Sequence, residues 1–178
     1  INNKILIPMI EEAKQKLIPL FKVSKEELSK FRKPTISRHF GRDEYTDKCG
    51  DSPAYYPVEN FLYFPQKNFW YKGVELFDTA TIQHEVGHYI HCQLNKEIIE
   101  GYRRFSIEGR DQMGTHVLGE IVAEYGNIIL GDRDYSKYPH DTINKGAFRV
   151  FNKHGPSFLP KLSRMTLDEA IREEIVKI

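Results

Sequence analysis

The stretch of sequence that decides the fold is TATIQHEVGHYIH, residues 79–91. Asp78 and Thr79 offer N-cap oxygens at its start, and apolar residues recur at helical spacing with no proline as far as Leu94. We therefore expect a helix over residues 79–94. Gly87 costs such a helix about 1 kcal/mol relative to alanine, and the close approach of another backbone is one reason that would justify it.

The same stretch contains an HExxH motif, formed by His84, Glu85 and His88. Two histidines four residues apart lie on one face of a helix, close enough to share a metal ion, and the glutamate after the first projects from their flank. This arrangement supplies two zinc ligands and one general base. His91 lies on the same face, but two helical turns place it about 10 Å from His84, so we expect it to be structural or to flank the cleft.

HExxH supplies two metal ligands, whereas catalytic zinc usually takes three protein ligands and leaves the fourth position for water. A third ligand must therefore come from another part of the chain. The candidate segment is EIVAE, residues 120–124, on a helix that the apolar pattern predicts over residues 115–130. Glu120 and Glu124 would share one helical face, where their repulsion costs a few tenths of a kcal/mol. A nearby cation would remove that cost.

HExxH followed downstream by Glu-x-x-Ala-(Asp or Glu) resembles the gluzincin group of zinc metallopeptidases. The resemblance covers about residues 50–130 and implies a zincin-like fold with one catalytic Zn²⁺. It implies that Glu120 is the third zinc ligand and that Glu124 accepts a hydrogen bond from His84 or His88. The last position departs from the usual pattern, in which aspartate is commoner than glutamate.

A hairpin is predicted before this helix, because two aromatic-rich runs, residues 54–56 and 61–64, are separated by turn residues. The unpaired backbone groups of an edge strand can bind an extended peptide by strand addition. In gluzincins the outer strand of such a hairpin aligns the substrate. The resemblance therefore implies that Ala54 and Tyr55 bind substrate.

A peptidase also needs a donor for the oxyanion that forms during hydrolysis. Tyr138, His140 and His154 lie downstream of the glutamate helix, where related enzymes often place a Tyr or His for this role. We rank His140 first and Tyr138 second, although spacing alone selects neither.

We expect the rest of the chain to support the site rather than to take part in its chemistry. We expect an α+β domain over residues 1–178: a small twisted mixed sheet whose edge strand lies over the active-site helix and the glutamate helix, flanked by N- and C-terminal helices. Residues 95–114 are charged and irregular and predict a loop over the site. The other expected elements are helices over 4–21, 24–31, 142–153 and 167–177 and a strand within 35–40.

Composition narrows the function classes. A chain of 178 residues is long enough to bury a hydrophobic core without a structural metal ion. The net charge of +1, with both signs interspersed, indicates neither a nucleic-acid surface nor a polybasic membrane patch. No apolar run approaches the roughly 20 residues that span a bilayer, and Cys49 and Cys92 are too few for a disulfide framework. We expect a cytoplasmic protein without a nucleic-acid or membrane partner.

These observations predict a zinc-dependent endopeptidase that acts on a peptide or protein substrate, with Glu85 as general base and acid. A regulatory peptidase that cleaves repressors is a close variant. The rivals are a catalytically silent protein that keeps zinc and binds peptides, and a latent zymogen. The intact Glu85 argues against a silent protein, since binding alone needs no base.

Overall fold

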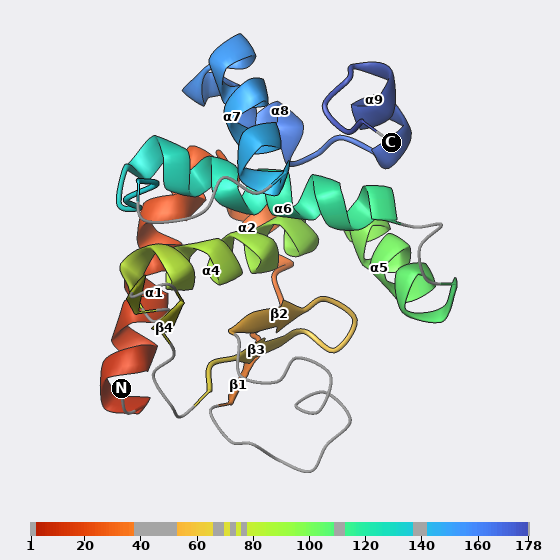
Figure 1. The fold of residues 1–178 in the computed structure, drawn as a ribbon. Coiled ribbons are helices and arrows are strands. Elements are labelled where there is room, and N and C mark those ends of the chain that lie inside the picture. Colours follow the sequence, from red (N-terminus) through yellow and green to blue (C-terminus); the bar gives the residue numbers. More distant parts are fainter. Residues whose placement is uncertain are drawn as a thin grey trace.

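The computed structural model describes residues 3–37, 53–65, 70–71, 74–75, 78–108, 113–136 and 142–177. Within these ranges the chain is α+β and mostly helical, with a small mixed sheet (Figure 1). The helices are α1 Asn3–Leu20, α2 Lys25–Ser29, α4 Thr79–Leu94, α5 Lys96–Glu108, α6 Met113–Leu130, α7 Thr142–His154, α8 Leu159–Leu162 and α9 Leu167–Arg172, with a 3-10 turn, η2, at Pro156–Phe158.

The sheet has three short strands, β1 Thr35–Ser37, β2 Ala54–Tyr56 and β3 Phe61–Tyr63. β3 lies in the centre, parallel to β1 and antiparallel to β2, with Tyr55 opposite Leu62. The predicted hairpin is therefore confirmed, and β2 is an edge strand of this sheet. A separate antiparallel pair, β4 Trp70–Tyr71 and β5 Val74–Glu75, precedes α4.

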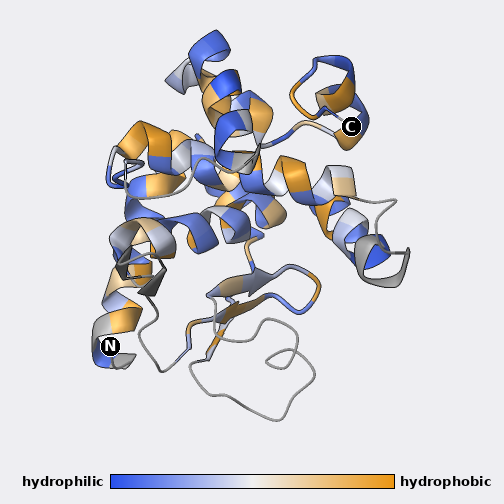
Figure 2. Cartoon of the chain, in the orientation of Figure 1, coloured by the Kyte–Doolittle hydropathy of each residue, from blue (hydrophilic) through white to orange (hydrophobic). Residues whose placement is uncertain are grey.

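Helix α4 occupies the middle of the fold. It packs on β2, α1 and α6, and α7, α8 and α9 pack in turn on α6 (Figure 1). Most of its side chains are buried, including the apolar Ile82, Val86 and Ile90. The hydropathy view shows apolar and polar residues alternating around the outer helices, as expected for helices with one buried face (Figure 2).

The prediction of an irregular loop over residues 95–114 is wrong for residues 96–108, which form α5, and for Met113 and Gly114, which begin α6. Ile98 and Ile99 are 2% and 7% exposed, and together with Tyr102 they form the apolar face of α5. The many charged residues of the segment make this apolar face hard to recognise from the sequence. Asn95 separates α4 from α5, and its side-chain amide donates to the Met165 carbonyl at 2.8 Å.

The C-terminal helix is shorter than predicted, since α9 ends at Arg172 rather than Lys177. Glu174 adopts a φ of 61°, and the Ile175 N–H bonds the Ala170 carbonyl at 2.8 Å, which closes the helix with a residue in the left-handed conformation. The chain then turns back and buries Ile175 and Val176. Burial of these two side chains therefore takes the place of further helical turns.

Within the described ranges, no helix combines the length and apolar character that crossing a membrane requires.

Candidate metal centre

The local sequence fixes the start and the direction of α4. Asp78 is its N-cap, and the Asp78 Oδ1 atom accepts the Thr81 N–H at 2.8 Å, which satisfies one of the backbone donors left free at a helix N-terminus. His84 and His88 follow one turn apart, and their ring centroids lie 4.8 Å from each other. The motif histidines therefore point the same way from one face of the helix.

Gly87 sets how closely α6 approaches this face. A Cβ atom at position 87 would lie 3.2 Å from the Ala123 Cα and 3.4 Å from the Ala123 oxygen, so the two backbones are in near contact. The expectation of a close backbone approach at Gly87 is confirmed. Because Ala123 lies between Glu120 and Glu124 on α6, the close approach carries both carboxylates to the histidines.

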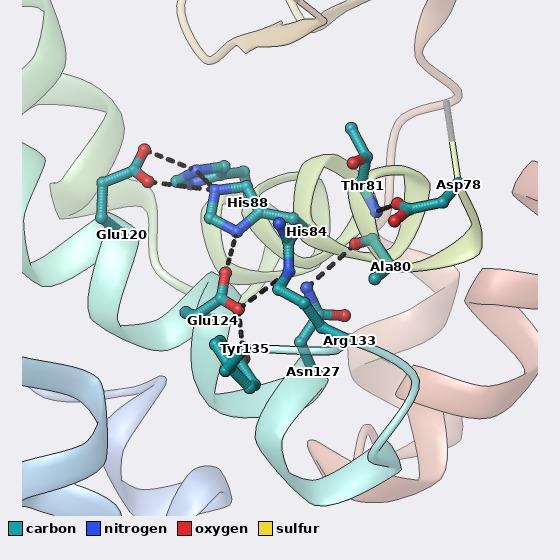
Figure 3. A network of polar contacts seen from close by, with 10 residues as sticks. All are labelled: Asp78, Ala80, Thr81, His84, His88, Glu120, Glu124, Asn127, Arg133 and Tyr135. Atoms are coloured by element: carbon teal, nitrogen blue, oxygen red, sulfur yellow. Dashed lines mark hydrogen bonds and ion pairs between the residues drawn. The ribbon is translucent and has the colours of Figure 1, made fainter. Parts of the chain in front are cut away.

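Figure 3 shows the resulting cluster. His84 Nε2 lies 3.0 Å from Glu120 Oε2, His88 Nε2 lies 2.9 Å from Glu120 Oε1, and the two Nε2 atoms are 3.1 Å apart. The ligand atoms around a tetrahedral zinc ion lie about 3.3 Å from one another, because zinc–nitrogen and zinc–oxygen bonds are about 2.0–2.2 Å long. His84, His88 and Glu120 are the one group of this kind found among the described residues, and they can hold a metal ion with little movement.

Glu124 contacts His84, one of the two histidines that the sequence left open as its partner. Glu124 Oε2 lies 2.7 Å from His84 Nδ1. Its other oxygen, Oε1, accepts a hydrogen bond from the Tyr135 hydroxyl and lies 3.2 Å from Arg133 Nε. The Glu124 side chain is 3% exposed, so these contacts replace water around the carboxylate.

The charges of the cluster depend on one another. Burial alone would raise the pKa of Glu124, but the hydrogen bond and charge of His84, with Arg133 and Tyr135, lower it to about 2. Burial likewise opposes the charged forms of His84 and Glu120, yet the two carboxylates raise the pKa of His84 well above its ordinary value. His88 and His84 lower the pKa of Glu120 well below its ordinary value.

These contacts leave a place for a cation between His84 and Glu120. Because ionised Glu124 can only accept, Nδ1 of His84 must donate to it. A neutral His84 then turns the lone pair of Nε2 toward the Glu120 carboxylate oxygen at 3.0 Å. Two electron-rich atoms at that distance need a positive charge beside them, either a second proton on His84 or a metal ion.

Glu85 lies beside the cluster and faces the sheet. It is 9% exposed. Burial raises the pKa of Glu85 above its ordinary value, whereas His84, His88 and a hydrogen bond from the Tyr55 backbone oppose the shift. A carboxyl with a raised pKa next to a cluster that can hold a metal ion has the property required of a group that takes up and releases a proton.

The other predicted site residues have different outcomes. Ala54 and Tyr55 lie in edge strand β2, which packs against α4. Tyr138 and His140 lie outside the described residues. His91 is fully buried and does not belong to the metal-binding group.

Sequence reasoning missed three residues near the site. Arg133 and Tyr135 follow the end of α6 and carry no helical or strand period that would have pointed to Glu124. Tyr102 of α5 places its hydroxyl so close to Gly119 that a Cβ atom there would overlap it. Burial and nearby negative charges, among them Glu120, raise the pKa of Tyr102 well above its ordinary value.

No family model matches this chain, and no curated protein or solved structure shows significant similarity to it. The likeness to gluzincins therefore rests on the motif residues and on the geometry into which the chain folds them.

Proposed function

We propose that this chain is a zinc-dependent peptidase of the gluzincin type. The observation that carries the proposal is the convergence of His84 Nε2, His88 Nε2 and a Glu120 oxygen within 4.8 Å of one another, with Glu85 beside them. Two histidines and one glutamate are a ligand set of catalytic zinc, whereas a structural zinc site is closed by a fourth Cys or His. The side chains of His84 and Glu120 remain 14% and 19% exposed, so solvent reaches the cluster.

A zinc ion bound there would polarise the scissile carbonyl and lower the pKa of a water molecule. Glu85 takes the proton of the attacking water on a carboxylate oxygen and passes it to the nitrogen of the leaving amine. Its buried position suits this role, because burial raises the pKa of Glu85 and brings proton uptake closer to neutral pH. Glu124 meanwhile keeps the Nδ1 proton of His84 in place.

The substrate class follows from the sheet. β2 pairs with β3 along one edge, and its other edge has no strand partner within the described residues. An extended peptide can bind such an edge through backbone hydrogen bonds, and β2 contacts α4, the helix that carries Glu85. Ala54 and Tyr55 would then align the peptide beside the base.

The test separates catalysis from metal binding. Glu85→Gln keeps the size of the side chain but cannot accept the proton, so we expect about one zinc per chain and a loss of peptide hydrolysis of at least about 100-fold. Zinc content is measured by metal analysis, and hydrolysis with a mixture of fluorogenic peptides. Glu120→Gln is the companion variant and should lower zinc content. A Glu85→Gln protein that hydrolyses peptides as fast as the parent would refute the proposal.

A further inference from the structure

Glu124 is held at both of its oxygens, and each oxygen has a different task. Oε2 lies 2.7 Å from Nδ1 of His84, while Oε1 receives the Tyr135 hydroxyl and lies 3.2 Å from Arg133 Nε (Figure 3). A glutamate side chain has three rotatable bonds, and fixing them costs conformational entropy. The Tyr135 hydrogen bond and the Arg133 ion pair at Oε1 restrict the rotation that would otherwise turn Oε2 away from the histidine.

The segment that carries Arg133 and Tyr135 is tied to α4 and to α7. Gly131, with a φ of 72°, ends α6 and lets the chain fold back. Asp132, the next residue, accepts a hydrogen bond from the Gln83 side chain of α4 at 2.9 Å. The Tyr135 ring packs edge-on against Phe148 of α7 with centroids 4.7 Å apart. Arg133 and Tyr135 are thus held in place through contacts with α4 and α7.

We propose that Arg133 and Tyr135 are positioning residues that fix the Glu124 carboxylate. Glu124 then holds the His84 ring with Nδ1–H toward its own carboxylate and Nε2 toward His88 and Glu120. The inference rests on the proposed function, because it concerns affinity for the metal of that same site. It adds a layer that the HExxH and EIVAE motifs do not contain. Both residues contact Glu124, which in turn contacts His84, so we expect their effect to pass through these two side chains.

The consequence is a measurable loss of metal affinity without loss of a ligand. Residues that support a ligating histidine typically change metal affinity by about 10–100-fold when mutated. We expect Tyr135→Phe and Arg133→Gln each to weaken Zn²⁺ binding by about 10-fold, and the double variant to weaken it further. Zinc affinity is measured by competition with a chromophoric chelator on the full chain.

A second readout tests orientation rather than affinity. In the zinc-loaded protein labelled with ¹⁵N-histidine, the Nδ1–H proton of His84 should give a slowly exchanging signal in the parent. In Tyr135→Phe and Arg133→Gln the same proton should exchange with water faster, because the carboxylate that accepts it is free to rotate. A role limited to fold stability would not move this signal at temperatures where the variants are fully folded.

Tyr125→Phe is the matched control. Tyr125 is the neighbour of Glu124 on α6, but its hydroxyl donates to the Gly155 carbonyl at 2.6 Å, away from the cluster. This variant loses one partly buried hydrogen bond and should keep the zinc affinity of the parent.

The possible results separate the two proposals. If the parent binds zinc and both variants bind it within twofold of the parent, the positioning role is refuted and the proposed function stands. An equal loss in Tyr125→Phe would also refute it, since the effect would then be general loosening. If the parent binds no zinc, both proposals fail. Weaker binding with faster Nδ1–H exchange in the two variants alone supports the inference.

Discussion

Two histidines of α4 lie in opposite electrostatic surroundings. His84 lies between the carboxylates of Glu120 and Glu124, which favour its charged form. His91 is completely buried, and neither ring nitrogen has a hydrogen-bond partner among the described residues. Burial first, and then the charge of His88, lower the pKa of His91 to about 3. His91 is therefore a neutral core residue at every pH at which the site would work.

The burial of His91 predicts how stability changes with pH. The unfolded chain protonates this side chain near pH 6.5, whereas the folded chain stays neutral down to about pH 3. Between these values the unfolded state binds more protons, so stability falls as pH decreases, by at most about 1.4 kcal/mol per pH unit from this group. Urea unfolding of metal-free protein from pH 4 to pH 7 measures the slope.

His91→Phe should remove this contribution while keeping a ring in the core. The variant is compared with the parent because other groups titrate in the same range, and His84 has the opposite sign. A raised folded-state pKa gives His84 a stabilising contribution that is complete below pH 6.5 and is lost as pH rises toward the folded value. Identical pH slopes for parent and His91→Phe would contradict the assignment.

At the scale of secondary structure elements, the contact between α4 and α6 builds the site. Gly87→Ala should gain up to about 1 kcal/mol of helix propensity, yet its Cβ would lie 3.2 Å from the Ala123 Cα. Because the obstacle is backbone, the helices must separate by a few tenths of an ångström. We expect a net destabilisation of about 1–3 kcal/mol and weaker zinc binding, measured by urea unfolding and by chelator competition.

Gly146→Ala in α7 is the matched control for this prediction. Its Cβ would meet the end of the Ile121 side chain at 3.5 Å, which is an ordinary van der Waals contact. This variant should therefore be as stable as the parent or more stable by up to about 1 kcal/mol, with unchanged zinc affinity. If Gly87→Ala behaved like Gly146→Ala, the close helix approach would not limit the site.

The same elements show what the sequence can and cannot predict. The positions of Glu120 and Glu124 on one face were predictable, because a helix fixes which residues share a face once its period is recognised. α5 was missed because the apolar pair Ile98 and Ile99 stands among charged residues, and only packing against the core reveals its buried face. Tyr135 approaches Glu124 through a chain reversal after α6, and no local pattern encodes that contact.

For the molecule as a whole, the cluster joins two central helices that pack on different neighbours. α4 lies against the sheet and α1, and α6 lies against α7, α8 and α9 (Figure 1). A metal ion held by His84 and His88 of α4 and by Glu120 of α6 would link these two groups of elements. Unfolding would release the ion, so metal binding must add to the stability of the whole chain.

Removing the metal should therefore lower stability without unfolding the protein. A free zinc concentration 100 times the dissociation constant stabilises the folded state by about 2.7 kcal/mol. A chain of 178 residues is long enough to bury a core without the help of a metal. We expect protein treated with a chelator to keep its far-ultraviolet circular dichroism at 25 °C, to unfold at lower urea concentration, and to regain its stability on adding zinc.

Glu120→Gln is the control variant, and its stability should respond much less to zinc. Complete loss of structure on chelation would instead indicate a structural metal and would contradict the open, catalytic type of site proposed for His84, His88 and Glu120.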